Sequence, residues 1–563
     1  MSNIFNELTI MLAGEAGAGV QSTEAILLSL IKNAGYNVFA TKEYMSRVRG
    51  GTNSITIRIS GDRIFNQNGE PDIFIPFDLN AYERYKNDLS ANTLTIADKK
   101  VINNENIFDL SFNEIALTVG DKIYSSMVVT GTVCGIIGTE IEDLKLHIIK
   151  RFEPKGEQIV SNNIKAAEAG YEEGRKIVKN SEMEIQIKRS NNVRDEILLS
   201  GSESIALGAL AGGCDSIFSY PMTPGTGVFT ALASWATQAG VVVEQAEDEI
   251  AAINMAIGAW YAGGRAMVST SGGGFALMTE GVSLSGMTET PVVIHLAQRP
   301  GPATGLPTRT EQGDLNLGLY AGHGVFARAI FAPGSLEQAY ELSRHAFEIA
   351  DKYQSPVIIL TDQYLTDVFY NSPEFKLYPS PKKHIIEASE GYKRYDIGQG
   401  VLSPRGIPGY GIGRVCVDSD EHDESGRITE DLNGISLKMK NKRFMKLSLL
   451  KEAALVPDLY GCDDYETLFV CWGSILSIAQ EAVLKFGKKS ALLHFKQVFP
   501  ISGEASDFFR KAKQIIMIEN NQTAQFKNLL EHEIGIKIPI SILKYNGLQF
   551  TAGELYDRIK EVV

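Results

Sequence analysis

The amino-acid sequence predicts an α/β protein built from three doubly wound domains. Short apolar segments ending in glycine- or proline-rich turns alternate with helical patterns, which is typical of strands joined by helical crossovers. This alternation occurs over residues 1–184, 185–378 and 456–563. At about 150 residues per domain, a chain of 563 residues has room for three such domains and a connecting segment, 379–455.

The first domain opens with an apolar strand expected at Leu8–Ala13 and a helix expected from about Ser22 to Ala34, followed by two strands at Tyr36–Ala40 and Ser54–Ile59. The turn between the first strand and the helix reads G-E-A-G-A-G, starting at Gly14. Glycines there let backbone N–H groups reach a ligand at the positive end of a helix. The spacing is not the G-x-G-x-x-G dinucleotide fingerprint, so a ligand-binding turn and a simple tight turn both stay open.

An R-V-R-G-G segment, Arg47 to Gly51, follows in the same domain. Its two arginines, Arg47 and Arg49, suit an anion. Surface arginines in a loop explain the segment equally well. Both interpretations stay open at this stage.

The second domain contains five expected strands: Ser216–Ser219, Val241–Val243, Ala266–Thr270, Val292–Ala297 and Val357–Thr361. Parallel strands end at the same edge of a sheet, and ligands of open α/β sheets bind there. Four polar or glycine-rich segments follow these strands. We therefore expect the four segments to converge on one site.

The first two of these segments contain a threonine and a glutamate. Tyr220-Pro-Met-Thr-Pro fixes the backbone on both sides of Thr223, because each proline restricts itself and its predecessor. Glu249 follows three other acidic residues, Glu244, Glu247 and Asp248, and begins a helix that is apolar nearly all round. Such a helix should be buried, and a buried carboxylate needs a partner.

The other two segments are a glycine turn and a rigid loop. Thr270-Ser-Gly-Gly-Gly leads from a strand into a helix. The loop from Arg299 to Asp314 contains three prolines, three glycines and two arginines, Arg299 and Arg309. This composition indicates a rigid loop with the capacity to bind an anion.

The last domain has strands expected at Thr467–Trp472, Ser490–His494 and Gln514–Glu519, with helices at Ile475–Phe486 and Ala524–Ile534. Residues 379–455 show little periodicity and are expected to form a linker or functional loop.

Composition excludes several classes of protein. The net charge is −14, from 54 basic and 68 acidic residues, which argues against a general nucleic-acid binder. No signal peptide or membrane segment is evident, so a cytoplasmic location is expected. The five cysteines form no C-x-x-C pair, which disfavours a disulfide framework or zinc site and predicts five buried free thiols.

Long motifs in the second domain resemble the alpha subunits of 2-oxoacid:ferredoxin oxidoreductases. The blocks are Y-P-M-T-P (220–224), where Met222 replaces the isoleucine of the family motif, E-D-E-I-A-A-I-N-M-A-I-G-A-W-Y-A-G (247–263), S-T-S-G-G-G (269–274) and G-P-A-T-G-L-P-T-R-T-E-Q-G-D-L (301–315). The first domain resembles the gamma subunit of this family, fused in front, through G-E-A-G-A-G-V and R-V-R-G-G-T. Residues 420–424 resemble the family's linker, and the last domain resembles a transketolase C-terminal domain.

The resemblance implies a gamma-type domain, a pyrimidine-type domain that binds thiamine diphosphate, a linker and a transketolase C-terminal-like domain. It implies that Glu249 hydrogen-bonds the aminopyrimidine ring, with Tyr220, Pro221 and Gly273 as further cofactor-binding residues. Thr223 and Arg299 would contact the 2-oxo acid, so that Glu249, Thr223 and Arg299 form the catalytic set. Two more loop residues, Thr308 and Arg309, are further substrate-binding candidates.

The resemblance also implies a partner. The chain has no G-D-G followed about thirty residues later by N-N, the usual magnesium–diphosphate signature, and no cluster cysteines. Mg²⁺ and an iron–sulfur cluster are therefore expected on a separate beta subunit, with coenzyme A as co-substrate, ferredoxin as electron partner, and an alpha–beta heterodimer or its dimer as the assembly. No metal ligand is expected on this chain.

Alternatives remain at this stage. Within the family, 2-oxoglutarate is favoured over pyruvate or a branched-chain 2-oxo acid. A non-catalytic Rossmann-like nucleotide-binding scaffold would also have the glycine turns. A transketolase-like sugar enzyme would need a histidine-rich site, and the histidines of this chain are scattered.

Overall fold

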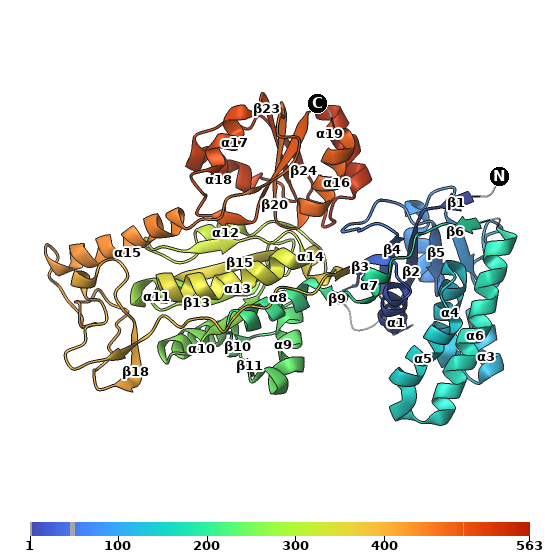
Figure 1. Ribbon diagram of the computed structural model, residues 1–563, viewed down its shortest axis with the longest axis horizontal. Coiled ribbons are helices and arrows are strands. Elements are labelled where there is room, and N and C mark those ends of the chain that lie inside the picture. The colour runs from blue at the N-terminus through green and yellow to red at the C-terminus, as the bar shows by residue number, and fades with distance from the viewer. Residues whose placement is uncertain (1–2, 18, 46–50, 182, 488) are drawn as a thin grey trace. The chain divides into compact units, whose positions relative to one another are not determined.

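The computed structural model describes residues 3–17, 19–45, 51–181, 183–487 and 489–563. It divides into two compact units. Unit 1 comprises Met1–Leu199 and Val368–Glu374, and unit 2 comprises Ser200–Asp367 and Phe375–Val563. Both units are built from sheets covered by helices (Figure 1), which confirms the predicted α/β class. None of the helices in these residues is long and apolar enough to cross a membrane.

Unit 1 contains an eight-stranded mixed sheet. Its order is β7 (Phe108–Asp109), β6 (Leu94–Ala97), β5 (Ile73–Pro76), β2 (Glu7–Glu15), β4 (Thr52–Ser60), β3 (Asn37–Glu43), β16 (Phe369–Ser372) and β9 (Ile197–Ser200). The strands from β7 to β2 are parallel, whereas β4, β3 and β16 each run antiparallel to the preceding neighbour. The three strands predicted for the first domain are β2, β3 and β4. A separate ladder joins β1 (Asn3–Phe5) to β8 (Met183–Ile185).

Side-chain contacts, in addition to backbone pairing, hold strand β16 against β3. The carboxamide of Asn371 accepts a hydrogen bond from the Val38 N–H at 2.8 Å and donates to the side chain of Asn37 at 3.0 Å. The ring of Tyr370 stacks on Phe39 with centroids 5.9 Å apart. Unit 1 is therefore completed by residues that follow the first part of unit 2 in the sequence.

Helices cover both faces of this sheet. They are α1 (Val20–Asn33), α2 (Leu79–Tyr85), α3 (Phe112–Val119), α4 (Ser125–Ile137), α5 (Ile141–Phe152), α6 (Glu157–Asn180) and the short α7 (Asn191–Arg194). Helices α4 and α6 approach unusually closely: a β-carbon on Gly131 would lie 2.1 Å from the carbonyl oxygen of Ala167, and one on Gly170 would lie 2.0 Å from that of Val128. Glycine at these positions lets the two backbones touch.

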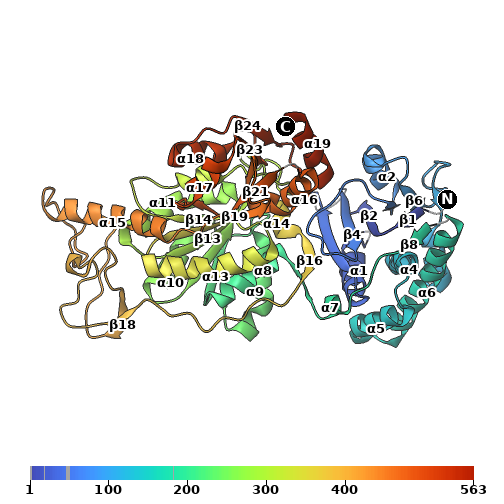
Figure 2. The same cartoon turned by 45° about the horizontal axis from the view of Figure 1, so that its top comes forward.

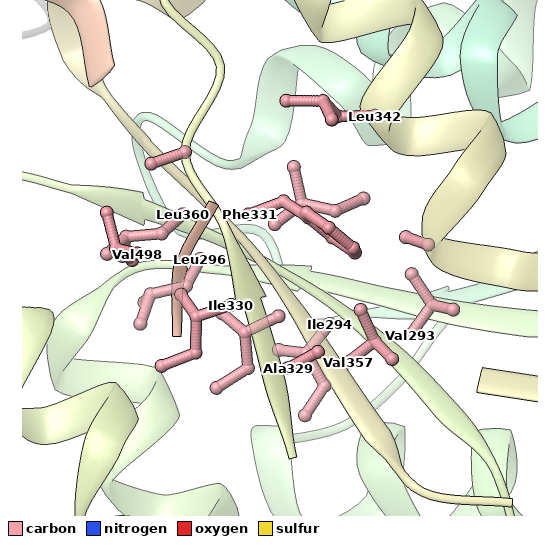
Figure 3. Packing of buried hydrophobic residues seen from close by; sticks show 14 of the residues in the cluster. Val293, Ile294, Leu296, Ala329, Ile330, Phe331, Leu342, Val357, Leu360 and Val498 are labelled. Atoms are coloured by element: carbon pink, nitrogen blue, oxygen red, sulfur yellow. The ribbon is translucent and has the colours of Figure 1, made fainter. Parts of the chain in front are cut away.

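Unit 2 contains a seven-stranded sheet. Its order is β11 (Val242–Gln245), β10 (Ser216–Ser219), β12 (Ala266–Thr270), β13 (Val292–Gln298), β15 (Pro356–Asp362), β14 (Ala329–Phe331) and β22 (Gln497–Phe499). All neighbours are parallel except β22, which runs antiparallel to β14. The five predicted strands are present, and β14 and β22 are additions. Aliphatic side chains of β13, β14 and β15, with Leu342 and Val498, interlock in its core (Figure 3).

The helices around this sheet are α8 (Gly201–Ala211), α9 (Thr226–Ala239), α10 (Glu249–Tyr261), α11 (Gly272–Thr288), α12 (Leu315–Leu319), α13 (Leu336–Tyr353) and α14 (Gln363–Asp367). Three of them, α10, α11 and α14, begin directly after strands β11, β12 and β15 or their short turns. The crossovers therefore place helix starts and strand ends at one edge of the sheet, as doubly wound topology requires.

The C-terminal part of unit 2 forms a five-stranded sheet. Its order is β19 (Asp458–Gly461), β21 (Ser490–Phe495), β20 (Thr467–Trp472), β23 (Gln514–Glu519) and β24 (Ile540–Leu543), and β19 alone is antiparallel to its neighbour. Helices α17 (Ala505–Lys511) and α18 (Gln525–Ile534) cover one face, and α16 (Leu476–Phe486) and α19 (Ala552–Val562) cover the other (Figures 1 and 2). The predicted strands and helices of this domain are all present.

Residues 379–455 are more regular than the sequence indicated. They contain β17 (Ile386–Ala388), β18 (Gly406–Gly411) and the 18-residue helix α15 (Ile435–Glu452). The helix was missed because its buried side is cationic: Lys442, Arg443 and Lys446 are all buried. Hydrophobic periodicity, the signal for an amphipathic helix, is therefore absent from it.

Helix α15 is attached through a buried carboxylate. Nζ of Lys442 donates to both carboxylate oxygens of Glu289, at 2.8 and 2.7 Å, and Nζ of Lys446 lies 2.5 Å from Oε2. Burial opposes ionisation of Glu289, but Lys446, Lys442 and Arg394 together outweigh burial and hold its pKa well below the usual range. The carboxylate is thus ionised and anchors the helix.

We expect Glu289→Gln to destabilise unit 2 by about 3–5 kcal/mol, because it leaves two buried ammonium groups without their counter-charge. The checks are the thermal unfolding midpoint and the rate of proteolysis within Ile435–Glu452. The matched control is Asp507→Asn, which removes an exposed ion pair with Arg510 and should change stability by less than about 1 kcal/mol. Equal behaviour of the two variants would contradict this account of α15.

Candidate active site

Three consecutive glycines, Gly272 to Gly274, form the first turn of helix α11 and the centre of the candidate site. They follow the carboxyl end of β12, and Ser271 is the residue that precedes the helix. We call this segment the three-glycine turn. The backbone is bare there, so groups from other loops can approach it closely.

The carboxylate of Glu249 lies against the last of these glycines. Glu249 is the first residue of α10 and is only 3% exposed. A β-carbon on Gly274 would lie 2.5 Å from its Oε1 atom, so no larger residue fits opposite this carboxylate. Oε1 is buried and has no hydrogen-bond partner. The sequence predicts a buried glutamate here and a partner for it, and the residues that the structure describes supply none to this oxygen.

A second carboxylate, that of Asp314, lies against the first glycine. A β-carbon on Gly272 would be 2.4 Å from Oδ2 of Asp314, and Oδ2 is also buried without a partner. Two further buried atoms of this region lack partners, Oγ of Ser271 and Nε of Arg299. Each unpaired buried polar atom costs about 1–3 kcal/mol, so four of them around one turn indicate a place for a ligand.

Electrostatics in this region centre on Asp314. Burial and, to a smaller extent, the nearby Glu311 raise the pKa of Asp314 to about 6, although Arg299 opposes the shift. Burial lowers the pKa of the Arg299 guanidinium, and Asp314 opposes that change. The site therefore holds a carboxyl that titrates near neutral pH.

The proline-flanked segment after β10 reaches the same place through its backbone. Nη1 of Arg299 donates to the carbonyl oxygen of Thr223 at 2.7 Å, so the two predicted substrate residues are brought together. Tyr220 and Pro221 are exposed, and Met222 approaches Gly273, where a β-carbon would be 4.0 Å from its sulfur. Of the predicted cofactor residues, Gly273 is thus part of the turn, and Tyr220 and Pro221 lie in the segment whose Met222 approaches it.

The loop from Arg299 to Asp314 is held by the C-terminal part of unit 2. The Gln312 N–H donates to the carbonyl of Asn520 at 2.7 Å, and the Asn520 N–H donates back to Oε1 of Gln312 at 2.9 Å. Nε2 of Gln312 donates to the carbonyl of Trp472 at 2.9 Å, and Nε2 of Gln525 donates to that of Gly313 at 2.8 Å. These bonds fix the end of the loop that carries Asp314.

The other two predicted substrate residues lie in the middle of this loop, between Arg299 and Gln312. Thr308 is buried and Arg309 is half-buried. The next N–H, that of Thr310, donates to the carbonyl of Gly547 at 3.1 Å, and a β-carbon on Gly547 would lie 3.3 Å from Cβ of Arg309. This stretch therefore packs against the segment that follows β24.

Two residues of the site were not singled out from sequence. Ser271 and Asp314 stood inside recognised segments, but nothing marked their side chains. Their position in the sequence is the signal that could have marked them. Each lies next to a glycine, Ser271 at the end of a strand and Asp314 at the end of a rigid loop.

The expectation that the apolar helix headed by Glu249 is buried is confirmed for one face only. Ile250 is 51% exposed and Met255 is 42% exposed on α10, and Leu277 is 52% exposed on the neighbouring α11. The sequence could not distinguish this face from a core face, because both are apolar. An apolar face left open beside a site is typical of a surface that meets another chain.

Cysteine burial also differs from expectation. Cys134, Cys214 and Cys471 are buried free thiols, whereas Cys416 is half-buried and Cys462 is exposed. Among the residues that the structure describes, no group of three or more His, Cys, Asp or Glu side chains could hold a metal ion.

The glycine turn of unit 1 borders a cavity of about 410 Å³ at the carboxyl ends of β2, β5 and β6. Its wall includes Gly17 and three acidic residues, Glu15, Asp78 and Asp98. Carboxylates suit a ligand that donates hydrogen bonds, such as one with hydroxyl groups. Most of the R-V-R-G-G segment, including Arg47, Arg49 and Gly50, lies outside the described residues.

Two family models match the chain. One, described as pyruvate flavodoxin/ferredoxin oxidoreductase, thiamine diphosphate-binding, covers residues 207–441. The other, described as pyruvate ferredoxin/flavodoxin oxidoreductase, covers residues 9–173. The first match includes α10, α11 and the loop from Arg299 to Asp314.

Relatives and a solved structure agree with these matches. A 2-oxoacid:ferredoxin oxidoreductase alpha subunit from Sulfolobus sp is 29% identical, covering 99% of this chain and 97% of the relative. The 2-oxoglutarate synthase subunit KorA of Archaeoglobus fulgidus is 30% identical over 58% of this chain and 88% of the relative. The structure of 2-oxoglutarate:ferredoxin oxidoreductase from Magnetococcus marinus with 2-oxoglutarate, coenzyme A and succinyl-CoA bound has a TM-score of 0.91, with 28% identity and 99% coverage of both chains.

The motifs around the three-glycine turn, the fold and the full-length relatives lead to one conclusion: this chain belongs to the 2-oxoacid:ferredoxin oxidoreductase family, as a subunit of the alpha type.

Proposed function

We propose that this chain, together with a separate beta subunit, catalyses the coenzyme A-dependent oxidative decarboxylation of 2-oxoglutarate to an acyl-CoA and CO2, with electrons passed to ferredoxin, or the reverse reaction. The observation that carries the proposal is the buried Oε1 atom of Glu249, which has no hydrogen-bond partner and lies against Gly274. The names of the relatives favour 2-oxoglutarate, and pyruvate or a branched-chain 2-oxo acid is the alternative.

The residues around the three-glycine turn fit thiamine diphosphate. The orphaned Oε1 of Glu249 needs a hydrogen-bond donor, and the aminopyrimidine ring offers one. Tyr220, Pro221 and Gly273 would line the same side. When bound, thiamine diphosphate supplies the nucleophilic carbon and the electron sink for loss of CO2. The part of Glu249 is to hold the ring and to share a proton with it at Oε1.

Arg299 is the proposed ligand of the substrate carboxylate. Its Nη1 is engaged by the Thr223 carbonyl, but its Nε is buried and free, so a charge-assisted hydrogen bond remains available. Thr223, Thr308 and Arg309 are proposed as further substrate-binding residues. Their hydroxyl and guanidinium groups suit the oxygens of a 2-oxo acid.

The partner is proposed to cover the apolar face of α10 and α11. Ile250, Met255 and Leu277 would be buried by a second chain, which would also close the open side of the site. We propose that this beta subunit holds Mg²⁺ and the iron–sulfur cluster, and that the assembly is an alpha–beta heterodimer or its dimer in the cytoplasm. The domain roles proposed are gamma-type for 1–184, cofactor-binding for 185–378, a linker for 379–455 and transketolase C-terminal-like for 456–563.

Co-expression with the beta subunit tests the proposal. We expect the purified complex to reduce ferredoxin or methyl viologen under anaerobic conditions with coenzyme A and 2-oxoglutarate, and the chain alone to be inactive, because half of the site is missing. Pyruvate and branched 2-oxo acids serve as comparison substrates. A complex that lacks thiamine diphosphate and turns over none of these acids would refute the proposal, as would full activity of the isolated chain.

Glu249→Gln should lower kcat of the complex by about 100-fold or more, because the amide cannot exchange a proton as the carboxylate does. Thiamine diphosphate content should fall less than activity. Glu247→Gln is the matched control, since Glu247 is an exposed carboxylate two residues away; it should stay within about twofold of the parent. Retention of activity in Glu249→Gln would remove this residue from the mechanism.

Arg299→Lys should raise KM for the 2-oxo acid about 10- to 100-fold, since lysine keeps the charge but loses the planar donor pair. Steady-state kinetics on the complex, with thermal unfolding as a check on folding, measure this effect. An unchanged KM in a normally folded variant would mean that another group binds the carboxylate.

A further inference from the structure

The second carboxyl of the site, Asp314, has no role in the proposed function. Its backbone is fixed: the Asp314 N–H donates to Oε1 of Gln298 at 2.9 Å, and its carbonyl accepts from the Gly318 N–H at 2.9 Å. Its carboxyl group lies against Gly272, with Oδ2 buried and unpartnered. A buried group of this kind in a ligand site is not explained by stability, because leaving it unpaired costs free energy.

The charges around Asp314 are unbalanced. Arg299 is the cation that acts on it, and Glu311 is an acidic neighbour on the same loop. Across the three-glycine turn lies Glu249, against Gly274. The positive end of helix α11 favours an ionised carboxylate, but burial opposes ionisation more strongly, and the pKa of Asp314 rises to about 6. The ionisation of Asp314 therefore depends on the electrostatic field of Arg299 at its carboxyl group.

A bound carboxylate would change that field. An anion paired with Arg299 neutralises the cation that, among the described residues, favours ionised Asp314, and it adds negative charge in a desolvated region where charges interact strongly. Both effects increase the affinity of Asp314 for a proton. By linkage, a proton on Asp314 must strengthen binding of the anion by the same factor.

We propose that Asp314 takes up a proton from solvent when the carboxylate of the 2-oxo acid binds beside Arg299, and returns it when that carboxylate leaves. The affinity for the substrate is thereby coupled to pH. The inference rests on the proposed function, because it requires Arg299 to bind the substrate carboxylate. It makes Asp314 a residue that sets the charge of the site.

The test is the pH dependence of KM for 2-oxoglutarate between pH 5.5 and 8.5, measured on the complex with the beta subunit. In the parent enzyme KM should rise by up to tenfold per pH unit once the pH exceeds the pKa of Asp314, because the proton must then be gained on binding. Asp314→Asn should abolish the rise, so that KM becomes flat with pH. A purely structural role would instead shift KM by one factor at every pH.

Glu311→Gln is the matched control. Removing this neighbour lowers the proton affinity of Asp314, so the rise in KM should persist with its onset moved to lower pH. If Asp314→Asn retains the rise of the parent, the inference is wrong while the proposed function stands. If the parent complex turns over no 2-oxo acid, both are wrong.

Thermal unfolding of the free chain gives an independent readout. The pKa of Asp314 is raised in the folded state, so its contribution to stability is full below the pKa of an unfolded aspartate and is lost as the pH rises through about 6. Asp314→Asn should therefore raise the unfolding temperature at pH 8 and change it less at pH 5. The opposite pattern would show that Asp314 does not titrate as proposed.

Discussion

The close approach of two carboxylates to the first turn of helix α11 is the constraint on which the site depends. Glu249 and Asp314 come from different parts of the chain, and each occupies space that a β-carbon on a glycine of this turn would fill. The sheet places the turn, because β12 leads directly into it. The bare backbone of the turn leaves room for both acidic groups.

The C-terminal sheet holds one of the two. The ends of β20 and β23 meet the loop that carries Asp314, through reciprocal hydrogen bonds between Gln312 and Asn520 and a bond to the carbonyl of Trp472. A domain with no predicted site residue of its own thus fixes the position of the loop from Arg299 to Asp314. Hydrogen bonds between an uncharged amide side chain and the backbone suit this purpose, because they restrain the loop without adding charge to the site.

Sequence predicted the elements whose physical signal is local. Strands β10, β12, β20 and β23 appear with the predicted bounds, because buried parallel strands are short apolar runs with abrupt ends. Glu249 was predicted because a glutamate at the head of an apolar helix conflicts with its surroundings. Strand β14 is missed because three residues are too few to carry a pattern, and α15 because buried Lys442, Arg443 and Lys446 interrupt the apolar periodicity that Met439 and Leu450 would give. The partnerless state of Asp314 depends on a distance across the fold, which no local pattern contains.

The position of β16 late in the sequence has a consequence for folding during synthesis. Domains generally fold as units while the chain is being synthesised, yet the first sheet keeps the edge of β3 open until Phe369–Ser372 has left the ribosome, after the whole of Ser200–Asp367. An open strand edge invites pairing with other chains. During that interval the sheet of unit 1 lacks β16, and the edge of β3 stays unpaired. A fragment that ends before β16 would keep this edge exposed permanently.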